Sequence, residues 1–173
     1  MQVKKVRGGT QVTAEPVEVS VLSGAVQDLM TLLGEGGSSD PDPLAALVGI
    51  TSDAEKPSDP ALVRLLPDAY GDDDEAAAEF RRYTDADLRA GKRAHGSVVL
   101  DTLREGTFVL DRGQADAWIG SLNDLRLVLG TRLGVEQDSE PDVDPDDPAH
   151  QALALYYWLG WMQDAVLGTI SPR

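Results

Sequence analysis

The sequence contains no cysteine. This absence excludes disulfides, thiolate zinc sites and any thiol switch carried by the chain itself. Basic residues are also scarce, because 15 Lys and Arg stand against 30 Asp and Glu, for a formal net charge of -15. Since so acidic a chain repels a phosphate backbone, we expect no appreciable binding to duplex DNA at physiological salt.

Long apolar runs are absent as well. No stretch reaches the roughly 18 apolar residues that a membrane helix needs, so no contact with a membrane is expected. The start MQVKKVRGG lacks the apolar core of a signal peptide, which predicts a cytoplasmic location. The length of 173 residues suits a single domain over 1–173 that buries enough surface to fold unaided.

Residues that bind metals do not occur in a workable pattern. The two histidines, His95 and His150, lie on separate segments, so neither a two-His metal motif nor a His-assisted nucleophile can be drawn. At 100° per residue, His95 falls on the apolar side of its helix, which favours a buried core histidine over a ligand. The acidic run 72–75 precedes a helical stretch, where its carboxylates would point in different directions. The alternating acids of 142–146 resemble a calcium loop, but the glycine and the closing glutamate of that motif are missing. We therefore predict no metal and no organic cofactor.

Apolar periodicity predicts the fold. Stripes at helical spacing indicate four main helices, at about 15–33, 85–105, 111–134 and 148–168. Thr84 is expected to cap the second of these, and the third is expected to begin with a capping box of Asp111 and Gln114 and to end at Gly134. The Pro-bounded pieces LAALVGI and DPALVRLLPDAY indicate short helices, and the segments 35–42 and 135–147 indicate flexible loops. We therefore predict a mainly α, single-domain helical bundle of four main helices plus short helices, with a small N-terminal β-hairpin.

The predicted hairpin turns at Gly8 and Gly9. It carries the only basic cluster of the chain, Lys4, Lys5 and Arg7. Charged side chains on an exposed strand discourage aggregation. The same cluster is also a candidate contact for a protein partner.

The stretch AWIGSLNDLRLVLGTRLGV, 117–135, is apolar on nearly every side of a helical wheel, which predicts a central helix. Its polar members are candidates for a buried network, because a buried guanidinium requires acceptors; they are Asn123, Asp124, Arg126 and Arg132. One interpretation is that they tie the helix to its neighbours. The alternative is a pocket for a small molecule or an enzymatic substrate, formed by Asp124, Arg126 and Arg132 together with Arg81.

The helix at 148–168 has two apolar sides. One side is a regular stripe that suits the core, and the other carries Tyr156, Tyr157 and Trp161. The aromatic side is too apolar to face open water. Two interpretations remain, internal packing against the same chain or contact with a partner or a second copy, since Tyr and Trp are enriched at interfaces.

Four blocks follow one another along nearly the whole chain: RLLPDAY at 64–70, EFRRYT at 79–84, WIGSLNDLRLVLGTRLG in the central helix, and YYWLGWMQD at 156–164. This series resembles an uncharacterised, mostly helical domain family of actinobacteria, whose members are also labelled oxidative-stress transcriptional regulators. The resemblance implies regulation of redox and sulfur-metabolism genes through an RNA polymerase sigma factor or another transcription protein. The chain departs from a thiol-based sensor because it has no cysteine.

Two functions from different classes follow. The first is a non-enzymatic cytoplasmic regulator or adaptor that binds a protein, such as a sigma factor, through the aromatic face or the basic hairpin. The second is an enzyme or small-molecule binder with a pocket lined by Arg81, Arg126 and Arg132. A solvent-open pocket of converging arginines favours the second function, and closed ion pairs favour the first.

Overall fold

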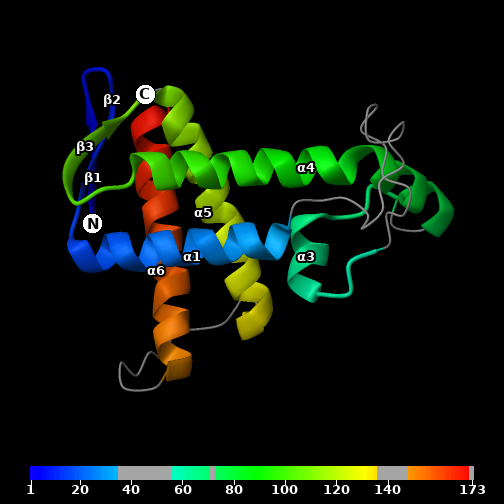
Figure 1. Ribbon diagram of the computed structural model, residues 1–173. Helices are drawn as coiled ribbons and strands as arrows, with labels where there is room; N and C mark the ends of the chain where they lie inside the picture. Colours follow the sequence, from blue (N-terminus) through cyan, green and yellow to red (C-terminus); the bar gives the residue numbers. More distant parts are fainter. Residues whose placement is uncertain (35–55, 71–72, 136–147, 172–173) are drawn as a thin grey trace.

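The computed structural model describes residues 1–34, 56–70, 73–135 and 148–171. Along the chain, the elements in Figure 1 are β1 (Gln2–Val6), β2 (Gly9–Ala14), α1 (Pro16–Leu33), α3 (Pro60–Leu65), α4 (Asp74–Thr102), β3 (Gly106–Leu110), α5 (Arg112–Leu133) and α6 (Pro148–Ile170). The predicted mainly α fold with an N-terminal hairpin is confirmed. The predicted short helix at 44–50 and, apart from Val135, the two predicted loops lie outside the described residues.

Helix α5 is the central element. It packs against α6, α4, α3 and α1 and also touches β2 and β3. In Figure 1, α1 and α4 lie side by side across α5 and α6. The core therefore collects around α5, whose Trp118, Leu122 and Leu125 are buried, and the prediction of a central helix is confirmed.

The ends of α5 follow local sequence signals. The carboxylate of Asp111 accepts a hydrogen bond from the Gln114 backbone N–H at 2.8 Å, and the Gln114 side chain accepts one from the Asp111 N–H at 2.9 Å. At the other end Gly134 is left-handed, with φ of 62°, and the Val135 N–H donates to the Gly130 carbonyl at 3.0 Å. Both caps satisfy backbone groups that a helix end leaves unpaired, as the sequence predicts.

The sheet has one strand more than the predicted hairpin. Strands β1, β2 and β3 are antiparallel in that order. The sequence pattern assigned 103–105 to a helix and left GTFVL without an element, because five residues give little periodicity. From β3, Phe108 and Leu110 point into the core, and the Phe108 ring lies 5.9 Å from the Trp118 ring, centroid to centroid.

The start of the second main helix was predicted wrongly. Thr84 was expected to cap it, but α4 begins at Asp74 and runs for 29 residues. The Asp73 carboxylate caps the helix by accepting from the Ala76 N–H at 3.0 Å, and the Thr84 hydroxyl donates to the Phe80 carbonyl. Acidic residues in the first turn and the alanines that follow favour this earlier start.

Within the part of the chain that the structure describes, none of the helices combines the length and apolarity needed to cross a membrane.

Candidate functional site

The four polar residues of α5 contact different neighbours. Asp124 faces α4, Arg126 faces α6, and Arg132 lies near Asp59, just before α3. Asn123 is half-buried. The structure thus distributes these side chains over separate links between helices and does not bring them to a common point.

Asp124 joins α5 to α4. Only 3% of this residue is exposed, and its Oδ1 accepts a hydrogen bond from Nζ of Lys92 at 2.6 Å. Burial raises the pKa of Asp124 above its ordinary value, and the hydrogen bond from Lys92, with a smaller effect of His95, opposes this rise. Lys92 could not be identified as the partner of Asp124 from the sequence, because the two residues are far apart along the chain.

His95 was expected on the buried side of its helix, but its side chain is exposed. It lies against Gly120 of α5: a Cβ at Gly120 would stand 2.5 Å from Nδ1 of His95. Gly120 therefore allows close approach of α4 and α5. Among the aliphatic residues of α4, Val99 is buried, whereas Leu88 is exposed.

Replacing Asp124 by Asn is expected to change how stability depends on pH. In the unfolded chain Asp124 titrates near 3.8, and in the folded protein its pKa is raised. Between these two values the folded state binds more protons than the unfolded state, so the carboxylate makes stability fall as pH rises. Urea unfolding of both proteins from about pH 4 to about pH 7 should show Asp124→Asn gaining stability relative to wild type across that window.

A matched control is Asp116→Asn, because Asp116 belongs to an exposed pair with Arg112 on the same helix. Its stability relative to wild type should stay nearly constant across the same pH series. A fall in the relative stability of Asp124→Asn with rising pH would contradict the assignment.

Arg126 joins α5 to α6. Its guanidinium donates to Oε1 of Gln163 at 2.8 Å and lies 5.3 Å from the centroid of the Tyr156 ring. Gly160 makes room for this group, since a Cβ there would stand 3.2 Å from Nε of Arg126. That Nε is buried and has no hydrogen-bond acceptor among the described residues. Arg126 therefore works as a packed link between the two helices through an amide and a ring face.

The other two arginines of the predicted pocket have carboxylate partners. Arg81 pairs with Asp68, which also pairs with Lys56. The hydrogen bond from Lys56, with a further one from Arg81, holds the pKa of Asp68 below its ordinary value against the opposing effect of burial. Arg132 is more than half exposed and lies 3.5 Å from Asp59, between Nη2 and Oδ2.

Arg132 also lines a groove of about 300 Å³ between α1, α5 and α6. Its other lining residues are aliphatic apart from one carboxylate: Ala25, Asp28, Leu29, Leu32, Leu125, Val128, Leu129 and Leu155. Arg81 and Arg126 are not part of this lining. The structure therefore does not bring the three arginines of the predicted pocket together in this groove.

The aromatic residues of α6 divide between the inside and the outside. Tyr156 lies over Gly130 of α5, where an added Cβ would be 3.2 Å from the ring. Tyr157 is half-buried and meets Tyr156 edge to face at 5.3 Å between centroids. Trp161 is 49% exposed, and Leu167 on the same helix is 45% exposed. Of the predicted face, Trp161 is thus the residue that remains open to a partner.

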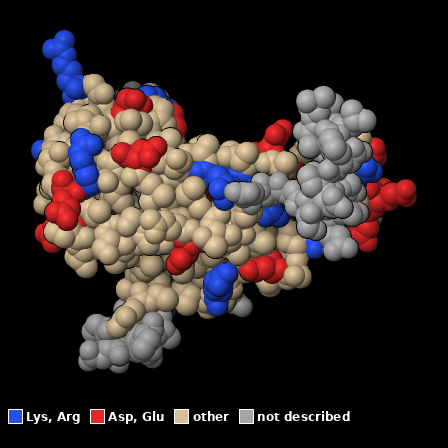
Figure 2. All heavy atoms as spheres, in the orientation of Figure 1, with Lys and Arg blue, Asp and Glu red and all other residues tan. Residues whose placement is uncertain are grey.

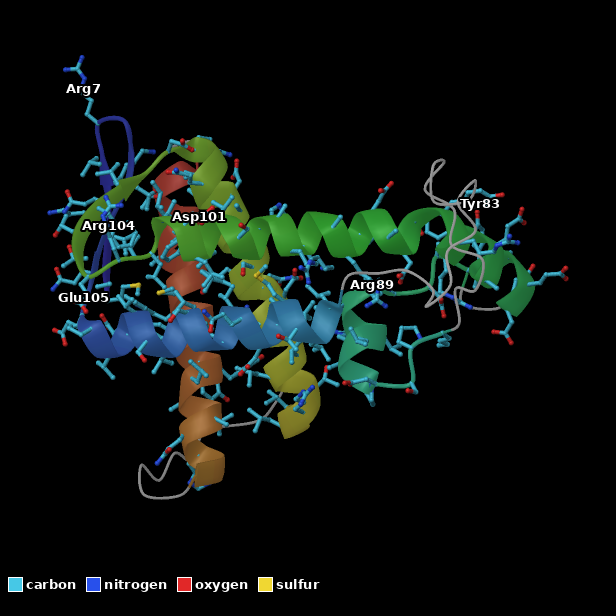
Figure 3. All side chains as sticks on the ribbon, viewed as in Figure 1. Arg7, Tyr83, Arg89, Asp101, Arg104 and Glu105 are labelled. Carbon is cyan, nitrogen blue, oxygen red and sulfur yellow. The ribbon has the colours of Figure 1, made fainter. Side chains whose placement is uncertain are left out.

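Two arginines of α4 that the sequence did not single out hold the end of α1. Arg89 donates to the Leu33 carbonyl at 2.5 Å, and Arg93 donates to the carbonyls of Met30 and Gly34 at 3.0 and 3.1 Å. Figure 3 shows Arg89 between the two helices. The last carbonyls of a helix lack intrahelical partners and attract cations. Because residues four positions apart lie on the same face of a helix, the spacing of Arg89 and Arg93 was the sequence signal that could have identified them as a pair.

Among the described residues, no three His, Asp or Glu side chains group in a way that would hold a metal ion. The acids at 142–146, which lack the glycine and glutamate of a calcium loop, lie outside the described residues, as does residue 72 of the acidic run. Features of the described part that are open to solvent include Trp161 on α6 and the groove at Arg132.

The amino-acid sequence matches a known family along almost the whole chain. The family model described as a domain of unknown function, DUF2017, matches residues 1–170. The chain belongs to the DUF2017 family. This family is the one that the sequence resemblance indicated, and that prediction is confirmed.

Curated relatives of this chain carry a functional name. A protein of Mycobacterium leprae, named putative oxidative stress regulator AosR, is 37% identical over 86% of this chain and 76% of its own length. Proteins of Mycobacterium bovis and Mycobacterium tuberculosis, named oxidative stress regulator AosR, are 33% identical over the same shares. No solved structure matches the chain.

Proposed function

We propose that this DUF2017 protein is a non-enzymatic cytoplasmic regulator or adaptor in the transcriptional response to oxidative stress, and that it acts by binding a protein such as a sigma factor. The observation that carries the proposal is the name of the mycobacterial relatives, oxidative stress regulator, at 33–37% identity over 76% of their length. The similarity covers 86% of this chain, so a shared mode of action is the simplest account.

The arrangement of polar residues supports a binding protein over an enzyme. Asp124 is joined to Lys92, Arg81 to Asp68, and Arg126 to Gln163 and Tyr156. These contacts engage the side chains that would otherwise bind a substrate. Closed pairs of this kind favour the adaptor interpretation over the pocket lined by Arg81, Arg126 and Arg132.

The charge of the protein supports contact with a protein rather than with a promoter. On the face shown in Figure 2, acidic and basic side chains are interspersed, and the chain as a whole carries a formal charge of -15. Duplex DNA binding depends on many cations that release counterions. Regulation would therefore pass through the transcription machinery, with the chain bound to a protein component.

The source of the redox signal is part of the proposal. Because the sequence has no cysteine, a thiol of this chain does not sense the oxidant. The signal would reach the chain through its partner, whose affinity for the chain would differ between oxidised and reduced states. Capture of the tagged chain from cells with and without peroxide should then enrich a sigma factor or an RNA polymerase subunit in a peroxide-dependent manner. If mock captures from untagged cells recovered the sigma factor and the RNA polymerase subunit equally well, the result would argue against the proposal.

Trp161→Glu is expected to separate binding from folding. Because about half of Trp161 is exposed, a charge there should change the free energy of unfolding by no more than about 0.5–1 kcal/mol. It should weaken contact with a partner, or with a second copy if the protein is a homodimer. Light scattering at several concentrations, with thermal melts in parallel, measures both effects.

Leu159→Glu is the matched control for Trp161→Glu, because Leu159 is fully buried on the same helix. It should abolish cooperative melting. If Trp161→Glu unfolds the protein in the same way, the exposed α6 face is part of the core and the interface hypothesis is wrong.

A further inference from the structure

The sheet has two edges, and they differ in cover. At the β1 edge, α6 packs against the strand, and Nζ of Lys5 lies 3.4 Å from the Ser171 carbonyl oxygen. At the β3 edge, the neighbours with appreciable contact are β2, on the paired side, and α5. Figure 1 shows β3 curving along the rim of the sheet. We name the β3 edge the open edge, because it has less helical cover than the β1 edge.

The register tells which backbone groups of β3 face outward. Val6 pairs with Gly9 across the two-residue turn, so this closing pair exchanges hydrogen bonds and the next pair does not. Consequently the backbone of Thr10, one position further along β2, points away from β1 and toward β3, where it pairs with Leu110.

Alternation along β3 then assigns its remaining residues. Leu110 and Phe108 direct their N–H and C=O groups to β2, so Thr107 and Val109 direct theirs to the open edge. Among the described residues, no backbone hydrogen bond outside the sheet reaches Thr107 or Val109. Val109 is 49% exposed, and the strand GTFVL carries no charge or proline to protect its edge.

Charges at the ends of β3 argue against a second copy as the occupant. Two β3 strands that face each other with Thr107 opposite Val109 would also set Glu105 toward Asp111 and Arg104 toward Arg112 of the other copy. Like charges directly opposite each other destabilise a strand pair. A different chain is therefore the better occupant.

Arg104 specifies the chemistry of that chain. Its guanidinium lies 5.2 Å from the centroid of the Phe108 ring, beside the sheet, and the ion pairs of the described residues do not include it. Figure 3 shows Arg104 at the sheet and Arg7 extending from the tip of the hairpin. Arg7 lies at the hairpin tip, near the Leu110 end of β3, whereas Arg104 precedes the Gly106 end, so the arginine at that end of the strand is Arg104.

We propose that the open edge of β3 binds an extended acidic segment of a protein partner, which adds a fourth strand beside Thr107 and Val109 and sets a carboxylate against Arg104. This proposal rests on the proposed function, because it takes protein binding to be the role of the chain. Main-chain hydrogen bonds would supply affinity, and Arg104 would supply selectivity for acidic side chains.

A capped peptide that alternates valine and glutamate, Thr-Glu-Val-Glu-Val-Glu-Thr, tests this edge without any sigma factor. Peptide binding should slow amide hydrogen exchange at Thr107 and Val109 while Thr10, already paired, changes little. Val109→Pro removes an outward N–H and leaves the β2 ladder intact, so it should weaken binding about tenfold. Val109→Thr, which keeps the N–H, should bind like wild type, and cooperative melts of both variants verify folding.

Charge selectivity has its own test. Arg104→Glu should weaken binding of the glutamate peptide, and a peptide with lysine in place of glutamate should bind this variant better than it binds wild type. Absence of peptide binding to wild type, or equal binding by Val109→Pro, would overturn the proposal. Protection of Thr107 and Val109 that grows with protein concentration in the absence of peptide would show a second copy as occupant and would also overturn it. Because the peptide replaces the partner, these outcomes are independent of whether a sigma factor binds.

Discussion

Trp118→Ala is expected to cause a loss of about 3–5 kcal/mol in the free energy of unfolding. Trp118 is fully buried in α5, packs against the ring of Phe108 of β3 in a tilted arrangement and donates from Nε1 to the Thr102 hydroxyl at 2.8 Å. It therefore connects the central helix to the sheet and to the end of α4. Urea unfolding followed by circular dichroism measures the loss.

Trp161→Ala is the matched control, since it removes the same side chain from the half-exposed position on α6. It should cost about 1 kcal/mol or less. Trp118→Phe, which keeps an aromatic ring but loses the hydrogen bond to Thr102, should fall between the two. Equal losses for Trp118→Ala and Trp161→Ala would contradict the placement of α5 at the centre of the core.

Gly9→Ala is expected to destabilise the protein by about 2–4 kcal/mol, through backbone strain together with forced separation of packed groups. Gly9 has a φ of 154°, and a Cβ at this position would stand 2.0 Å from the Leu110 carbonyl oxygen. Because that oxygen belongs to the backbone of β3, the two strands would have to move apart. Urea unfolding together with amide hydrogen exchange at Thr10 measures the effect.

Gly8→Ala is the control for Gly9→Ala within the same turn. Gly8 has a φ of 101° but no heavy atom within 4 Å of an added Cβ, so its cost should be limited to backbone strain of about 1 kcal/mol. If Gly8→Ala costs as much as Gly9→Ala, the close approach of Leu110 does not determine the stability of the sheet.

The parts of the fold that the sequence predicted are those with local signals. The capping pair Asp111 and Gln114 and the closing Gly134 marked both ends of α5, and its all-round apolarity marked it as central. The third strand and the true start of α4 were missed. The strand GTFVL forms because it pairs with β2, which lies nearly a hundred residues earlier in the chain. The early start of α4 results from helix propagation, which a short sequence window does not reveal.

The polar residues of α5 show the same limit. The sequence identified Asp124 and Arg126 as buried or half-buried groups in need of partners, and the structure supplies those partners. It did not indicate Lys92 or Gln163, because each lies on another helix and only tertiary packing brings it near. A list of candidate residues on one helix therefore did not distinguish a shared site from separate links.

The most direct test of the proposed adaptor function is calorimetric titration of the purified chain into purified sigma factors and core RNA polymerase from the same organism. The account predicts saturable binding to at least one of them with a Kd of about 1 µM or below, weakened by Trp161→Glu or by Val109→Pro in protein that still melts cooperatively. No measurable binding to any of these proteins, in oxidised or reduced form, would contradict the account.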